Sequence, residues 1–114
     1  AGPNDETWRH NGRDVQVDGR DGKTLLEPKW CGQNAKAWTK SQYHPGHRHY
    51  DEAKLVDQAR RLLALDAATG GTGVRYVVPH ADAQSAFMTL WRRHFPAEVQ
   101  AKRLTVVIDS GAGM

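Results

Sequence analysis

The sequence contains a single cysteine, Cys31, among 114 residues. An internal disulfide is therefore impossible, which excludes small secreted scaffolds held by disulfides and zinc sites built from several cysteines. A zinc nucleobase deaminase is excluded by the same count, because it needs a pair of cysteines. Cys31 has no evident activating partner in the sequence, so we interpret it as structural rather than as the nucleophile of a cysteine hydrolase.

Long apolar runs are also missing. No stretch approaches the length of a membrane span and no signal peptide is visible, so we expect no membrane contact. The chain begins at Ala1 without an initiator methionine. We therefore expect a processed product or an excised domain, with any targeting signal in an upstream part.

Neither charge sign dominates strongly. The net charge of +3 tolerates a polyanionic partner without requiring one. A content of 39% hydrophobic and 25% charged residues is typical of a globular protein, and the length fits one domain over 1–114, with a lead-in at 1–5 and a tail at 110–114. Basic residues and histidines concentrate between positions 29 and 61, which predicts a basic face: Lys29, Lys36, Lys40, His44, His47, Arg48, His49, Lys54, Arg60 and Arg61.

The first third of the chain has the pattern of antiparallel strands. Residues 6–10 precede Asn-Gly, a strong hairpin signal, and residues 14–18 alternate apolar and polar side chains. A second turn is predicted at "GRDG", and a third strand follows over 23–30. These segments predict a three-strand antiparallel meander.

Helices and strands alternate in the remainder. Residues 31–49 lack a clear period and predict an ordered loop or short helix over the sheet. The next segments predict a helix over 51–69 with Asp51 as its N-cap, a strand over 74–78, a helix over 81–95 and a strand over 103–109. Both strands are apolar on both faces, as in central strands. We predict an α/β (α+β) fold with a mixed sheet of about five strands flanked by helices.

The third predicted strand carries a group of charged residues. Glu27 and Lys29 are two residues apart and therefore share a face. The preceding turn brings Asp18 toward them. Asp21 is typical of a turn residue, because Asp-Gly is common in turns, and it is the substitute if Asp18 is wrong. Two carboxylates suit Mg²⁺, and a lysine beside the metal suits phosphodiester hydrolysis. The alternative is a solvent-facing charge pair on a half-exposed strand.

Asp18 followed by Glu27-Pro28-Lys29 resembles the PD-(D/E)xK signature of restriction-endonuclease-like nucleases. The chain is similar, more narrowly, to the restriction-endonuclease-fold toxin domains at the C-termini of bacterial polymorphic toxins. The motifs that carry this resemblance span roughly residues 6 to 108: "ETW" at 6–8, "VDG" at 17–19, "LLEPK" at 25–29, Trp38 and "QARR" at 58–61.

The resemblance implies a role for each matching position. Asp18 and Glu27 would hold Mg²⁺ or Mn²⁺, and Lys29 would be the catalytic lysine. Gln58 would orient a phosphate or the attacking water, and Glu6 would add an upstream acid to the metal site.

Two positions depart from the family pattern. Pro28 stands where many members have alanine or an aliphatic residue, and a proline predicts an edge position or a bulge in this strand. Leu62 stands where we expect a second glutamine four residues after Gln58.

The implied partners are a nucleic acid, DNA more than RNA, and an immunity protein made by the producing cell. The implied setting is a secreted or delivered bacterial effector that acts in the cytoplasm of the target cell. Candidates for contacts to nucleic acid are Lys36, Lys40, His47, Arg48 and Arg61. Two alternatives stay open: an RNase toxin, and a nucleic-acid-binding module of the same fold without catalysis.

Two features of residues 38–49 admit more than one interpretation. Trp38 and Tyr43 lie among basic residues and suit either base stacking or packing of the loop on the sheet. His44, His47 and His49 suggest zinc, but they lack a clear fourth ligand and a standard spacing, so a phosphate contact or a plain loop is favoured.

Overall fold

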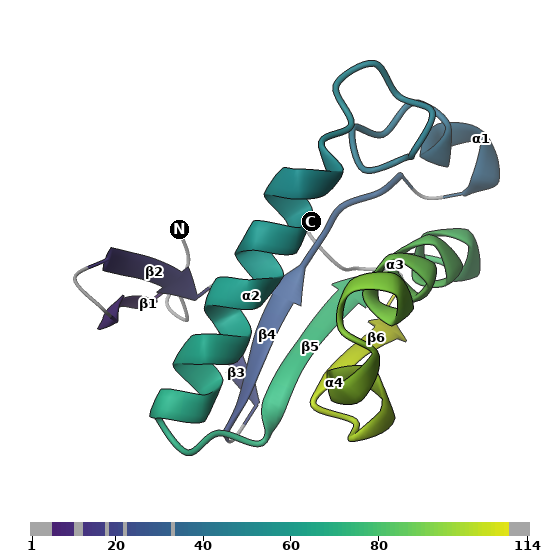
Figure 1. The fold of residues 1–114 in the computed structure, drawn as a ribbon. Coiled ribbons are helices and arrows are strands. Elements are labelled where there is room, and N and C mark those ends of the chain that lie inside the picture. Colours follow the sequence, from purple (N-terminus) through teal and green to yellow (C-terminus); the bar gives the residue numbers. More distant parts are fainter. Residues whose placement is uncertain (1–5, 11–12, 18, 22, 33, 110–114) are drawn as a thin grey trace.

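The computed structural model describes residues 6–10, 13–17, 19–21, 23–32 and 34–109, and before Lys23 it describes the course of the backbone only. Strands β1 (Glu6–His10) and β2 (Arg13–Val17) form an antiparallel hairpin in which Trp8 pairs with Val15. The predicted hairpin is therefore confirmed. It forms a small sheet of its own beside α2 (Figure 1).

The main sheet has four described strands, β3 (Gly19–Asp21), β4 (Thr24–Pro28), β5 (Gly73–Val78) and β6 (Leu104–Ile108), in that order. Strand β3 runs antiparallel to β4, whereas β4, β5 and β6 are parallel. The mixed α/β class is confirmed.

The predicted three-strand antiparallel meander is wrong. Strand β2 pairs with β1, and a separate short strand β3 pairs with β4. The predicted turn "GRDG" covers residues 19–22, whereas Asp21 pairs with Thr24, so the chain reverses two residues later than predicted. The other side of β4 is taken by the parallel strand β5.

The helices begin and end close to the predicted residues. Helix α2 (Glu52–Ala68) starts at Asp51, whose Oδ1 accepts the Lys54 amide at 3.0 Å. Helix α3 (Ala81–His94) starts at His80, whose Nδ1 accepts the Ala83 amide at 3.2 Å. A short helix α4 (Pro96–Gln100) follows with proline at its first position, where the missing N–H removes no helical bond.

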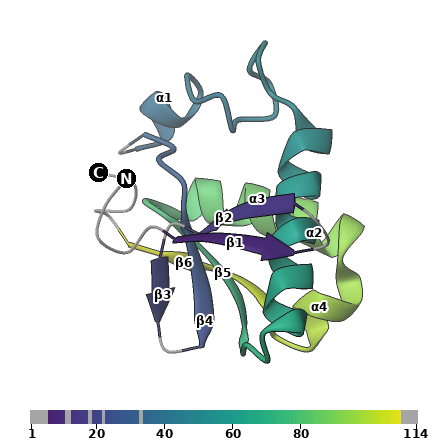
Figure 2. The same ribbon diagram turned by 90° about the vertical axis from the view of Figure 1, so that its left-hand side faces the viewer.

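Helices α2 and α3 cover the same face of the main sheet. The strand order β4-β5-β6 does not reverse, so two crossovers of the usual right hand place both helices on one side. Tyr76 of β5 confirms this, because its hydroxyl bonds to Gln58 of α2 and its ring lies 5.0 Å from that of Trp91 in α3. Figures 1 and 2 show the resulting layers.

The opposite face of the sheet is less buried. Arg75 and Val77 of β5 and Thr105 of β6 are half-buried, and Val107 of β6 is 37% exposed. Strand β5 is central, as predicted. The same prediction is wrong for β6, which is the outer strand of the described sheet, with α3 and α4 against its other face.

Residues 35–50 form a turn segment, which lies in the connection between β4 and α2. Helix α1 (Ala35–Trp38) leads into a series of turns in which the amides of Ser41, His44, His47 and Tyr50 each bond to the carbonyl three residues earlier. Trp38 is buried and packs against the rings of His44 and His80, so of its two interpretations packing is the one observed. Within the described residues, no helix is long and apolar enough to cross a membrane.

Candidate active site

The candidate site lies at the carboxyl end of β4, on the face covered by the helices. Alternation along β4 buries Leu25 and Glu27, and Glu27 is only 3% exposed. Lys29 follows on the same face, with its Nζ 3.0 Å from Glu27 Oε1. The solvent-facing interpretation of this pair is therefore wrong. A buried carboxylate is costly unless it is paired and hydrogen-bonded, and Lys29 supplies the opposite charge.

Gln58 supplies a second donor to the same carboxylate oxygen. It projects from α2, and its Nε2 lies 3.1 Å from Glu27 Oε1. The sequence separates these residues by 31 positions, and the packing of α2 on the sheet joins them. The structure thus brings together three of the predicted site residues: Glu27, Lys29 and Gln58.

Tyr76 continues this chain of hydrogen bonds. The β4–β5 register places Tyr76 directly beside Glu27, and its hydroxyl donates to Gln58 Oε1 at 3.2 Å. Burial, and then the charge of Glu27, raises the pKa of Tyr76 well above its usual value. The hydroxyl therefore stays protonated and remains a donor at neutral pH.

Tyr43 covers Lys29 from the turn segment. The Lys29 ammonium lies 5.3 Å from the centre of the Tyr43 ring, a distance that suits a cation–π contact. The Tyr43 ring also lies 6.2 Å from that of Phe87 in α3. The side chain of Lys29 is only 11% exposed as a result, and it stays close to Glu27.

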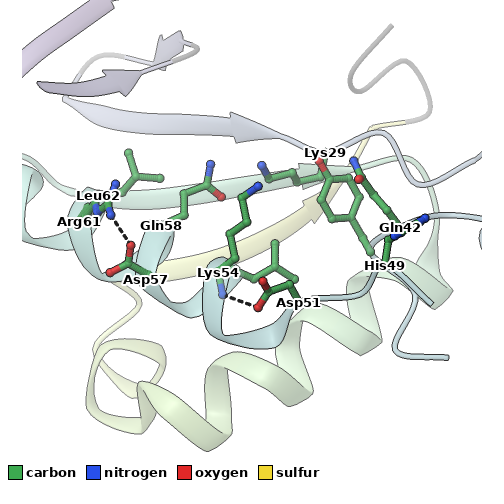
Figure 3. Close-up of a pocket in the computed structure, with 11 residues that line it drawn as sticks. Lys29, Gln42, His49, Asp51, Lys54, Asp57, Gln58, Arg61 and Leu62 are labelled. Atoms are coloured by element: carbon green, nitrogen blue, oxygen red, sulfur yellow. Dashed lines mark hydrogen bonds and ion pairs between the residues drawn. The ribbon is translucent and has the colours of Figure 1, made fainter. Parts of the chain in front are cut away.

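A cleft of about 560 Å³ opens over these residues, between the turn segment and α2. Lys29 and Gln58, both bound to Glu27, line it. In Figure 3 the side chain of Lys54 extends from α2 toward the ends of Gln58 and Lys29. The remaining lining residues are Gln42, Tyr43, His49, Asp51, Leu55, Asp57, Arg61 and Leu62.

The charges of the cleft are unequally compensated. Asp51 caps α2 through the Lys54 amide, and Arg61 pairs with Asp57 at 2.5 Å. Lys29 pairs with Glu27. The ammonium of Lys54 has no hydrogen bond or ion pair to any side chain that the structure describes. Lys54 is thus the cation best placed to receive an anion that enters the cleft.

The acids predicted on the first strands cannot be placed at the site. Asp18 lies outside the described residues. Glu6 lies in β1 and Asp21 in β3, and neither side chain is described. Gly19, which follows Asp18 in the sequence, pairs with Leu26, the residue before Glu27.

The residues predicted to contact nucleic acid divide into two groups. Arg61 lines the cleft, whereas Lys36, Lys40 and Arg48 are exposed and His47 is half-buried, and none of these four lines it. Lys40 and Arg48 nevertheless lie in the same turn segment that supplies Gln42, Tyr43 and His49 to the cleft. The predicted basic face therefore borders the cleft on this side.

Two of the three histidines in residues 35–50 cap turns. Nδ1 of His44 accepts the Gly46 amide at 3.0 Å, and Nδ1 of His47 accepts the His49 amide at 3.1 Å. These bonds occupy Nδ1 of both rings. Over the described residues, no group of three or more His, Cys, Asp or Glu side chains is arranged to hold a metal ion.

Pro28 is accommodated without a bulge. It pairs one-to-one with Val77, and the next amide, that of Lys29, bonds to the Val77 carbonyl at 2.9 Å. At this point of the parallel ladder the donating amides are those of Lys29 and Val77. The missing N–H of Pro28 therefore leaves no hydrogen bond between β4 and β5 unmade. The described pairing on the β3 side reaches Leu26 and not Pro28. Of the two predicted alternatives, the bulge is not observed, and an edge position agrees with the pairing that the described residues show.

Cys31 is fully buried, and its Sγ lies 3.4 Å from the Lys29 carbonyl. Burial raises the pKa of its thiol to about 12, and the nearby Lys29 charge only partly opposes this. The thiol is therefore protonated at neutral pH and a poor nucleophile, which agrees with a structural role.

Sequence reasoning missed Tyr76 and gave Lys54 no role of its own. Tyr76 alternates onto the same face as Val74 and Val78 in "VRYVV", and a tyrosine on an apolar face is a signal for a buried hydroxyl that needs a partner. Lys54 is four residues before Gln58, so helical spacing places both on one face of α2.

Comparisons of this chain with protein-family models, with curated proteins and with solved structures find no match.

Proposed function

We propose that the protein is a metal-dependent nuclease whose active site contains Glu27, Lys29 and Gln58, on a restriction-endonuclease-like fold. The buried Glu27–Lys29 pair carries this proposal. An ion pair of this kind adds little to stability compared with apolar side chains of the same size. Its place at a strand end, beside a cleft of polar lining, favours a chemical role.

Mg²⁺ or Mn²⁺ is the metal that suits the donors. The carboxylate of Glu27 is an oxygen ligand, and Mg²⁺ needs few protein ligands beside water and substrate phosphate. Asp18 is proposed as the second carboxylate, because it is bonded to Gly19 and Gly19 pairs beside Glu27. When bound, the metal lowers the pKa of a water molecule and neutralises phosphate charge.

The protein side chains supply position and charge. Lys29 is held by Glu27 and Tyr43 at the edge of the cleft, where an ammonium can bind a phosphate oxygen or orient the attacking water. Gln58 shares its amide between Glu27 and Tyr76, so the carboxylate is held in one orientation. A fixed geometry of this kind is what lowers the barrier of a phosphoryl transfer.

The substrate is proposed to be DNA rather than RNA, with a phosphodiester backbone bound along α2. Lys54 and Arg61 are about two turns apart on the cleft face of this helix. Tyr43 adds an aromatic ring at the mouth, on which a base can stack. The basic turn segment extends this surface with Lys40 and Arg48.

The biological role that we propose is that of an antibacterial toxin domain, delivered to a target cell and neutralised by an immunity protein. An acidic partner would complement the cations around the cleft. This part of the proposal rests on the motif order in the sequence and on the cleft charges together.

A nucleic-acid-binding module without catalysis is the second candidate. One observation supports this candidate. Glu27 lies 3.0 Å from Lys29 and neutralises its charge, as a purely structural ion pair would. The two candidates differ in whether the wild type cleaves nucleic acid.

The test is digestion of plasmid DNA and of a structured RNA with Mg²⁺, with Mn²⁺ and with EDTA. We expect cleavage of DNA by the wild type with metal, none with EDTA, and a loss of at least about 100-fold in Glu27→Gln and Lys29→Met. Asp82→Asn, at an exposed acid of α3 that does not line the cleft, is the matched control. Undiminished cleavage by both site variants would reject the site, and binding of DNA without cleavage by the wild type would favour the second candidate.

A further inference from the structure

A tyrosine from the buried layer of the sheet reaches the candidate site through one intervening side chain. The Tyr76 hydroxyl donates to Gln58 Oε1 at 3.2 Å, and Gln58 Nε2 donates to Glu27 Oε1 at 3.1 Å. Tyr76 comes from β5, Gln58 from α2 and Glu27 from β4. Three separate elements are thus connected by two hydrogen bonds.

The direction of each hydrogen bond in this chain is fixed by the one before it. An ionised carboxylate only accepts hydrogen bonds, so the NH₂ group of Gln58 must face Glu27. The carbonyl oxygen of Gln58 then faces Tyr76, whose hydroxyl must donate. A flipped amide would place two acceptors against each other, which is unfavourable for a buried group.

The Tyr76 ring is held firmly in place. It is fully buried, with ring centres 5.7 Å from Phe87 and 5.0 Å from Trp91. Close packing of this kind leaves a side chain one rotamer. The hydroxyl therefore presents its proton to Gln58 from a fixed point, whereas Gln58 itself lies on a half-buried helix face beside the cleft.

We propose that Tyr76 is a positioning residue, whose hydroxyl fixes the amide orientation of Gln58 and thereby keeps Gln58 Nε2 on Glu27. Only the kinetic consequence of this proposal rests on the proposed nuclease function. Loss of the hydroxyl frees the Gln58 amide to turn toward the cleft and its water. Glu27 then loses the hydrogen bond from Gln58 and keeps its pair with Lys29.

The test uses Tyr76→Phe, which keeps the ring and its packing. In the metal-free protein we expect the side-chain NH₂ resonances of Gln58 to shift and their exchange with water to accelerate. Gln58→Met identifies those resonances by their disappearance. With DNA and Mg²⁺ we expect kcat to fall roughly 10-fold, as for outer groups that orient a metal ligand, with KM unchanged. Tyr50→Phe, at a tyrosine that packs on the core and does not line the cleft, should change neither measurement.

A double-mutant cycle separates positioning from a general structural effect. If Tyr76 acts through Gln58, Tyr76→Phe costs nothing further in kcat once Gln58 is methionine. An equal loss in both backgrounds would overturn the proposal, as would unchanged Gln58 resonances in a folded Tyr76→Phe protein.

The wild type gives an independent readout if Tyr76→Phe fails to fold. Its Gln58 side-chain amide should exchange more slowly than that of exposed Gln42, and equal exchange would overturn the proposal. If the wild type cleaves no nucleic acid, the proposed function fails, while the resonance measurements still decide the role of Tyr76.

Discussion

The Asp66 carboxylate, which has no exposed surface, lies 2.6 Å from the guanidinium of Arg103. Its other oxygen accepts the Gly73 amide at 2.9 Å. Asp66 is in the last turn of α2, Gly73 begins β5 and Arg103 precedes β6. One side chain thus joins the end of the helix to the beginnings of two parallel strands.

Removal of the Asp66 carboxylate should destabilise the whole domain. Asp66→Ala leaves the buried Gly73 amide without an acceptor, so we expect the free energy of unfolding to fall by about 3 kcal/mol. Equilibrium urea unfolding measures this. Asp57→Ala removes a half-exposed pair with Arg61 and is the control, with an expected loss below about 1 kcal/mol. Equal losses in the two variants would contradict the assigned role.

Gly71 is required because a side chain at this position would collide with its neighbours, and not because of its backbone angles. A Cβ at this position would overlap Oδ1 of Asp66 and lie 2.9 Å from the Lys23 carbonyl oxygen. We expect Gly71→Ala to cost about 3 kcal/mol in unfolding free energy through this overlap. The neighbouring Gly70 has a φ of +68° and open space around its Cβ position, so Gly70→Ala should cost only about 1 kcal/mol from backbone strain. The reverse order would show that the contact at Gly71 relaxes freely.

The buried thiol of Cys31 predicts a loss of stability at alkaline pH. Its pKa is about 12 in the folded protein and 9.0 in an exposed thiol, so the folded state holds its proton more tightly. The stabilisation is complete below pH 9 and is lost as pH rises from 9 to 12. Tyr50 and Tyr76, whose pKa values burial also raises, act in the same direction.

Unfolding midpoints measured from pH 8 to pH 11 test this prediction. Cys31→Ala should flatten the decline relative to the wild type, although it lowers stability at every pH. Native Cys31 should also resist alkylation by iodoacetamide at pH 8 until the chain is unfolded. Rapid alkylation of the folded protein would contradict the burial of this thiol.

Lys54 should contribute to DNA affinity through charge rather than through base contacts. Lys54→Ala is expected to weaken binding about equally across DNA sequences and to reduce the slope of log Kd against log salt by about one. Fluorescence anisotropy in the presence of Ca²⁺, at several salt concentrations, measures both quantities. Lys23→Ala, an exposed lysine that does not line the cleft, is the control. An unchanged salt slope in Lys54→Ala would remove Lys54 from the binding surface.

Local patterns predicted most of the elements. The Asn-Gly turn, the Asp51 cap and the apolar stripe of α2 act within a few residues, so they can be read without knowledge of the fold. The pairing of the first three strands could not be read in this way. Its register depends on where the chain reverses, and the actual reversal before Thr24 left β2 with β1 and β3 with β4.

Residue spacing by itself determined that Glu27 and Lys29 share a face, because side chains two apart on a strand always do. Only the tertiary structure decided that this face is buried, that Gln58 and Tyr76 meet there, and that Tyr43 covers Lys29. The physical reason is that period-2 alternation fixes the direction of a side chain but not what packs against it. The partners come from α2, β5 and the turn segment, whose placement depends on the parallel order β4-β5-β6 and on the single face that both helices cover.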